Sequence, residues 1–191
     1  MKKIVLITVF IGTLFSSCKV NNALVSEKIV DCIDEGVKPK RELFGYPISQ
    51  YTVDTFTNFE EYLLTKGYIF SSSKQDYRRF IDDVITNPEK YKDIYDHVYN
   101  HDQYLDTKII YNPDFVLLYC PSTILEKEKN DVLSKQLEIM QNVLETTYGD
   151  KESVDKLFAA TPSENFKYLA FKIPVMYMVL LKVTQFHIPK G

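Results

Sequence analysis

Tryptophan is absent from this sequence, and glycine occurs only six times in 191 residues. The chain has no G-x-G-x-x-G, G-x-x-x-x-G-K-[ST] or G-x-S-x-G pattern, the motifs that form phosphate-binding loops and nucleophile elbows. It also lacks a basic excess, because its formal net charge is −3, whereas nucleic-acid binding depends on basic patches. We therefore expect no nucleic-acid partner and no cofactor.

Aromatic residues are plentiful despite the missing tryptophan, with 14 tyrosines and 12 phenylalanines. They provide a large apolar and amphipathic surface for a packed core. The low glycine count favours helices over turn-rich sandwiches. The length suits one globular domain.

The N-terminus has the layout of a secretory signal peptide. Lys2 and Lys3 form a positive start, and an apolar run follows over residues 4–15, as expected of an export signal. This run is too short for a membrane span, which needs about 20 apolar residues. We therefore predict that the segment is cleaved.

The residues Leu-Phe-Ser-Ser-Cys at positions 14–18 resemble the lipobox of bacterial lipoproteins. Ser16, Ser17 and Cys18 match that family's pattern, whereas Phe15 stands where the family usually has leucine. The resemblance covers residues 1–18. It implies that residues 1–17 are removed and that Cys18 carries a lipid.

Lipidation of Cys18 would tether the chain to the bacterial cell envelope. A single acyl chain binds a membrane only marginally, but a processed lipoprotein carries two or three, so attachment would be effectively permanent. The residues after Cys18 begin with Lys19 and include no acidic cluster before residue 27. We expect the anchored domain to face the periplasm.

Two further cysteines, Cys32 and Cys120, remain if Cys18 is lipidated. An even pair in an oxidising compartment can form a disulfide. The alternative is two buried thiols that behave as small apolar side chains. The sequence leaves both open, since it does not give the distance between the two Cα atoms.

Apolar residues recur at helical spacing along most of the chain. Gly36 and Pro39 predict a stop after the first helix, and Asn87 with Pro88 predicts the end of one helix and the start of another. The expected helices cover residues 22–35, 57–66, 73–87, 88–105, 111–120, 123–148, 154–158 and 161–183.

Four pairs of residues have the spacing of a capping box, in which a hydroxyl accepts from an early backbone N–H and an acidic side chain reaches back. They predict helix starts at Thr57 with Glu60, Ser73 with Asp76, Thr123 with Glu126, and Thr161 with Glu164.

The fold class predicted is mainly α, either a helical bundle or an irregular helical array. Residues 1–17 would be the signal peptide, residues 18–36 the lipidated N-terminus and first helix, and residues 37–191 a single helical domain. The alternative is an α+β fold in which the C-terminal segment 171–185 is a strand. Alternate apolar positions and Pro174 favour a strand, but apolar residues at the intervening positions favour a helix buried on all sides.

One set of side chains has metal-ligand spacing: Asp93, His97 and His101 lie four residues apart. On a helix they would present a carboxylate and two imidazoles from one side. However, the apolar face of that helix places them toward solvent. A solvated polar face is therefore the alternative interpretation.

Four tyrosines crowd the same part of the chain, namely Tyr91, Tyr95, Tyr99 and Tyr104. Tyrosine is enriched at protein interfaces because it combines apolar area with a polar tip. These residues are either an interface or partly buried edges of the core.

The sequence thus favours a membrane-tethered lipoprotein that binds a protein partner and is not an enzyme. A periplasmic immunity-type protein that neutralises a toxin is one form of this hypothesis. The alternative from another class is a divergent metal-dependent hydrolase that uses the region of His97 and His101.

Overall fold

The structure is a computed structural model that describes residues 21–44, 52–100, 113–147 and 149–187. All the regular elements within these residues are helices, with no strand among them. The mainly α fold class is confirmed. Residues 1–20, and with them the signal segment and Cys18, lie outside the described part.

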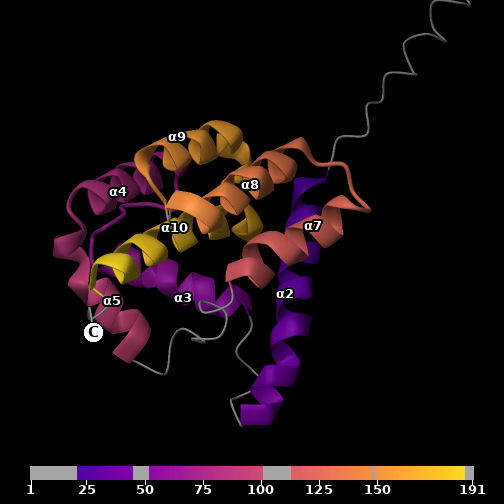
Figure 1. The fold of residues 1–191 in the computed structure, drawn as a ribbon, viewed down its shortest axis with the longest axis horizontal. Helices are drawn as coiled ribbons and strands as arrows, with labels where there is room; N and C mark the ends of the chain where they lie inside the picture. The colour runs from indigo at the N-terminus through magenta and orange to yellow at the C-terminus, as the bar shows by residue number, and fades with distance from the viewer. Residues whose placement is uncertain (1–20, 45–51, 101–112, 148, 188–191) are drawn as a thin grey trace, which may run out of the picture.

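The described helices form an irregular array around one central helix, α10 (Leu169–His187) (Figure 1). The other α-helices are α2 (Asn22–Phe44), α3 (Thr52–Thr65), α4 (Lys74–Thr86), α5 (Lys92–Asn100), α7 (Cys120–Leu125), α8 (Asp131–Asn142) and α9 (Lys151–Ala160). Short 3-10 helices cover Pro88–Tyr91 and Ser163–Asn165, and π-helical turns cover Phe115–Tyr119 and Val143–Thr147.

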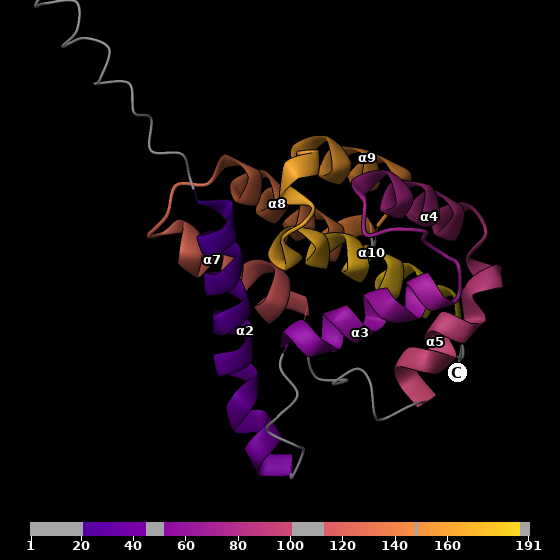
Figure 2. The same ribbon diagram turned by 180° about the vertical axis from the view of Figure 1, so that it is seen from behind.

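Helix α10 lies in the middle of the molecule from both sides (Figure 1, Figure 2) and contacts α2, α3, α4, α5, α8 and α9. Apolar residues cover its whole circumference, and each residue from Ala170 to Leu180 is buried. The alternative of a strand over residues 171–185 is therefore wrong. A helix surrounded by other helices can bury every side, which explains why its sequence shows no polar face.

By length and composition, α10 is the one helix in the described part of the chain that could cross a membrane, and 67% of its most apolar window is buried inside the protein. Pro174 lies within it and cannot donate a backbone hydrogen bond. Gln136 Nε2 of α8 donates to the Phe171 carbonyl oxygen at 3.1 Å, one turn before the proline. Helix α8 thus supports the turn that Pro174 weakens.

Several helix ends agree with the sequence. Ser73 caps α4 by accepting from the Asp76 backbone N–H at 3.2 Å. Helix α4 ends at Thr86, and Pro88 opens the next helical turn. Gly149 has a φ of +83° and lies between α8 with its final π turn and α9. A left-handed residue after a helix is commonly glycine.

The predicted end of the first helix near residue 35 is wrong, because α2 continues to Phe44. Gly36 has another role. A Cβ atom at Gly36 would lie 2.0 Å from Cζ of Phe115, so the absent side chain allows the phenylalanine ring to lie against α2. The glycine marks a close helix contact rather than a helix end.

Three predicted capping boxes are also wrong. Helix α3 begins at Thr52, before Thr57. Thr123 lies near the end of α7, and the expected long helix is divided in two because α8 begins at Asp131 with Asn130 as its cap. Thr161 follows α9 and donates to the Leu157 carbonyl oxygen at 2.8 Å. The spacing is present at each site, but the helices begin elsewhere. Thr161 and Glu60 bind distant residues instead, Gln136 and Lys172.

Helix α10 also carries one buried charge, Lys172. Its Nζ lies 2.8 Å from Glu60 Oε2, and the two side chains are only 8% and 14% exposed. The Tyr77 hydroxyl donates to Glu60 Oε1 at 2.8 Å. Burial first, and then the Glu60 carboxylate, raises the pKa of Tyr77 well above its ordinary value. Glu60 is therefore the centre of a buried network that joins α3, α4 and α10.

We predict that Lys172→Met lowers the free energy of unfolding by about 3 to 5 kcal/mol, because it leaves a buried carboxylate without its cation. A Lys172→Met, Glu60→Gln double variant should recover most of this loss, since neither charge is then buried. Urea denaturation measures both effects. The control is Lys92→Met, which breaks the exposed pair of Lys92 and Asp96 and should change stability little. Equal losses in the single and double variants would contradict the prediction.

Candidate functional site

The predicted metal ligands lie in a network of hydrogen bonds with tyrosines. Asp93 of α5 accepts from the Tyr62 hydroxyl at 2.8 Å and from the Tyr68 hydroxyl at 2.6 Å. The His97 ring stacks on the Tyr62 ring, with centroids 3.8 Å apart and planes 10° from parallel. The array joins α5 to the end of α3 and the residues that follow it.

Burial raises the pKa of Asp93, but hydrogen bonds from Tyr68 and Tyr62 and the charge of Lys66 outweigh it and hold that pKa below its ordinary value. Burial and the same carboxylate raise the pKa of Tyr62 and of Tyr68. The carboxylate is therefore ionised and both hydroxyls keep their protons at neutral pH. A metal at Asp93 would have to replace these hydrogen bonds.

No group of three or more metal-ligating side chains occurs within the described residues. His101, the third member of the predicted set, lies outside them. Asp93 and His97 lie on the same helix, and there Asp93 binds Tyr62 and Tyr68 while His97 stacks on Tyr62. What these two residues form is a link between helices.

The tyrosines singled out from the sequence do not share one environment. Tyr91 is 5% exposed and donates a hydrogen bond to the Asp83 carboxylate, so it is a core residue. Tyr95 is half-buried and packs against the core. The side chain of Tyr99 and the whole of Tyr104 lie outside the described part. Of the two interpretations left open by the sequence, Tyr91 and Tyr95 therefore fit that of residues packed in the core or at its edge.

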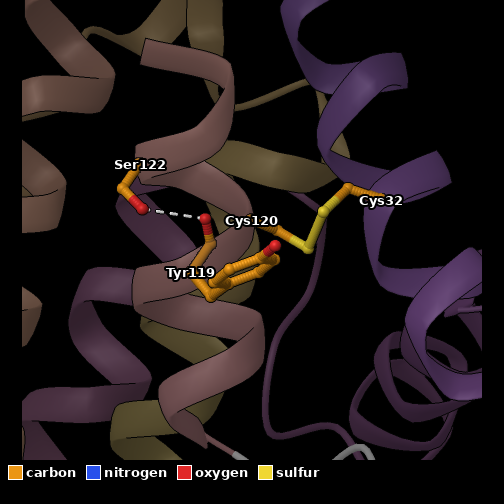
Figure 3. Close-up of a disulfide and its surroundings, with 4 residues drawn as sticks. All are labelled: Cys32, Tyr119, Cys120 and Ser122. Carbon is orange, nitrogen blue, oxygen red and sulfur yellow. Dashed lines mark hydrogen bonds between the residues drawn. A yellow bond between two sulfur atoms is a disulfide. The ribbon is translucent and has the colours of Figure 1, made fainter. Parts of the chain in front are cut away.

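Cys32 and Cys120 form a disulfide in the structure, with their Cα atoms 5.8 Å apart (Figure 3). The bridge joins α2 to the first residue of α7. Cys120 is fully buried, whereas Cys32 is half-buried. The sequence left open a disulfide or two buried free thiols, and the structure contains the disulfide.

A groove of about 730 Å³ runs between α2 and α7 beside this bridge. Its α2 wall is one helical face, formed by Lys28, Asp31, Cys32, Glu35 and Gly36. The opposite wall includes Phe115, Tyr119 and Lys127. It is the largest hollow described on the protein, and it combines apolar and charged groups.

Two stacked aromatic rings form the apolar part of the groove. The Phe115 and Tyr119 rings have centroids 5.4 Å apart and planes 17° from parallel. Tyr119 is 58% exposed, and Figure 3 shows its ring extending toward α2 on the side that carries the disulfide, while Ser122 points away. Phe115 is held in place by its close approach to Gly36.

The charges of the groove are only partly matched. Lys28 of α2 forms an ion pair across the groove with Glu128. Asp31 and Glu35 are exposed on the same face of α2, one turn apart, and neither has an ion pair or side-chain hydrogen bond within the described chain. Lys127 is the other exposed charge at the groove. The lining as a whole carries one net negative charge.

Comparison with known proteins supplies no relative for this arrangement. No family model matches the chain, and neither a curated protein nor a solved structure is similar to it at a significant level. The function must therefore be argued from the residues and their geometry.

Sequence reasoning missed the groove. Asp31 with Glu35 and Phe115 with Tyr119 are both spaced four residues apart, which puts each pair on one helix face. Asp31 and Glu35 lie on either side of Cys32, and Phe115 and Tyr119 come shortly before Cys120. A disulfide hypothesis would therefore have placed the acidic pair and the aromatic pair side by side.

We predict that a Cys32→Ala, Cys120→Ala double variant loses about 4 to 5 kcal/mol of unfolding free energy, from the chain entropy of a loop of this length. The bridge spans 88 positions. Urea denaturation with and without dithiothreitol measures it, and wild type in reductant should match the variant. A wild-type midpoint unaffected by reductant, together with free thiols that label before reduction, would contradict the prediction.

We also predict that Gly36→Ala destabilises the protein by about 1 to 3 kcal/mol, as expected for overpacking. Alanine normally stabilises a helix relative to glycine by roughly 0.5 to 1 kcal/mol, so the sign is diagnostic. The matched variant is Gly36→Ala with Phe115→Leu, which removes the ring that clashes. Thermal denaturation should show the single variant below wild type and a coupling between the two sites, whereas additive effects would contradict the proposed contact.

Proposed function

We propose that the chain is a lipid-anchored lipoprotein of the bacterial cell envelope whose helical domain works by binding a protein partner. The observation that carries the compartment is the Cys32–Cys120 disulfide, because disulfides persist in oxidising compartments outside the cytosol. It fits the signal-peptide layout and the lipobox-like residues that end at Cys18. The third cysteine is thereby left for the lipid.

The position of Cys18 relative to the folded domain supports a tether. Only residues 19–21 separate it from the start of α2 at Asn22, a connection of at most about 14 Å. Asn22 is fixed to the domain, since it donates to Asn165 Oδ1 at 3.2 Å and accepts from Asn130 Nδ2 at 2.9 Å. A lipid on Cys18 would hold the domain directly at the bilayer.

The binding role is supported by the groove between α2 and α7. An exposed aromatic side chain beside a hollow is typical of protein-interaction sites, and Tyr119 has this position. None of the residues that line the groove is a histidine or a serine, and its cysteine is bonded in the disulfide, so the lining holds no Ser–His or Cys–His pair of the kind used in nucleophilic catalysis. Binding therefore accounts for the groove more simply than a reaction does.

We predict that Cys18→Ala abolishes lipid attachment and moves the protein out of the membrane fraction or leaves it unprocessed. Intact-mass analysis of wild type should give a chain that begins at an acylated Cys18. The matched control is Ser17→Ala, which keeps a small residue before the cysteine and should be processed as wild type is. An unlipidated wild-type chain that retains residues 1–17 would overturn the tether.

The partner role has its own readout. Cross-linking of intact cells that express wild type should give one recurrent protein adduct in the envelope, and Cys18→Ala should reduce its yield because the domain is no longer held at the membrane. A wild-type domain that yields no recurrent adduct, although it is lipidated, would overturn the binding role and leave the tether standing.

A further inference from the structure

The aromatic pair and the acidic pair line the same groove from two different segments of the chain. Phe115 and Tyr119 belong to the π turn before α7, whereas Asp31 and Glu35 belong to α2, and all four line the same hollow. The disulfide fixes the two walls at a Cα separation of 5.8 Å between Cys32 and Cys120. The groove is therefore a preformed site with one aromatic wall and one anionic wall.

Like charges one helical turn apart repel each other, and Asp31 with Glu35 is such a pair. Several acidic side chains elsewhere on the protein have a cation beside them. Asp82 and Asp155 share Arg78, Asp96 has Lys92 and Glu152 has Lys156. Within the described residues the α2 pair has no such cation. Its carboxylates are thus available to a positive group from outside.

We propose that this groove binds an arginine side chain presented by a basic segment of a partner protein. Guanidinium is planar, stacks on aromatic faces and forms two parallel hydrogen bonds to carboxylates. The exposed Tyr119 ring offers the face, and Asp31 and Glu35 offer the acceptors. This inference rests on the proposed binding role and names the chemistry of the partner.

Arginine fits the groove better than lysine does. An ammonium group is a compact charge that keeps more of its water, whereas guanidinium is weakly hydrated and flat. The stacked rings of Phe115 and Tyr119 present a flat surface beside the carboxylates. We therefore expect a preference for arginine over lysine in peptides of equal charge.

The probe is a fluorescein-labelled peptide of alternating glycine and arginine, titrated with the purified full chain in detergent and followed by fluorescence anisotropy. Peptides with citrulline or lysine in place of arginine are the comparisons. Citrulline keeps the planar shape but replaces one NH2 group with a carbonyl oxygen, which removes the charge and part of the donor fork. The expected order of affinity is arginine above lysine, with citrulline at least tenfold weaker than arginine.

The decisive variant is Asp31→Asn with Glu35→Gln, which should weaken binding of the arginine peptide at least tenfold. Its matched control is Glu61→Gln with Glu89→Gln, the same charge change at two exposed residues of other elements, expected within threefold of wild type. Tyr119→Ala should weaken binding severalfold, whereas Phe186→Ala, at an aromatic that is 50% exposed on α10, should not. Circular dichroism and thiol labelling confirm that each variant is folded and bridged.

If the Asp31→Asn, Glu35→Gln variant and the Glu61→Gln, Glu89→Gln variant weaken binding equally, the peptide is attracted by net charge alone and the proposal is overturned. Equal binding of the arginine and citrulline peptides would also overturn it. A concentration-dependent dimer of wild type that is lost in the Asp31→Asn, Glu35→Gln variant would overturn it in favour of a second copy as occupant. The outcomes that would refute the proposed function differ from those that would refute the groove. Selective arginine binding without any envelope adduct would refute the protein partner, whereas an adduct without selective binding would refute only the groove.

Discussion

The ion pair of Lys172 and Glu60 is the constraint on which the arrangement of the helices depends. Lys172 belongs to α10, where residues 170–180 are all buried and Lys172 is the one charged residue among them. A buried charge tolerates only the position that brings it to its counter-ion. Glu60 of α3 is bound by both Lys172 of α10 and Tyr77 of α4, so a rotation of α10 would separate the buried ammonium from its counter-ion.

The parts of the fold that could be predicted are those decided by local sequence. The apolar stripe of α4 and its Ser73 cap involve residues within a few positions of one another, and both are present. The parts that were wrong depend on distant residues. Glu60 lies inside α3, which begins at Thr52, and its carboxylate binds Lys172, 112 positions away. Gly36 lies inside α2 and leaves the space that the Phe115 ring occupies.

The same distinction between local and distant contacts explains which parts of the groove could be predicted. The cysteine pair was visible in the sequence, but the groove beside it exists only because the bridge and the Gly36 contact bring α2 against the segment that begins at Phe115. The spacing of Asp93 and His97 suggested metal ligands, whereas in the structure their side chains contact tyrosines. Their neighbours Tyr62 and Tyr68 come from another part of the chain, which no periodicity within α5 could reveal.

The attachment of Asn22 to Asn130 and Asn165 determines how the domain would stand on a bilayer. A lipid on Cys18 would be joined by a short link to this fixed helix and would allow little tumbling, so the start of α2 would face the membrane and the groove would lie farther along the helix. Gly36 is 14 residues beyond Asn22, which corresponds to about 21 Å of helix. A partner resident in the same envelope would meet the groove at a raised effective concentration, so weak contacts would suffice for occupancy, whereas the same contacts would fail between freely diffusing molecules.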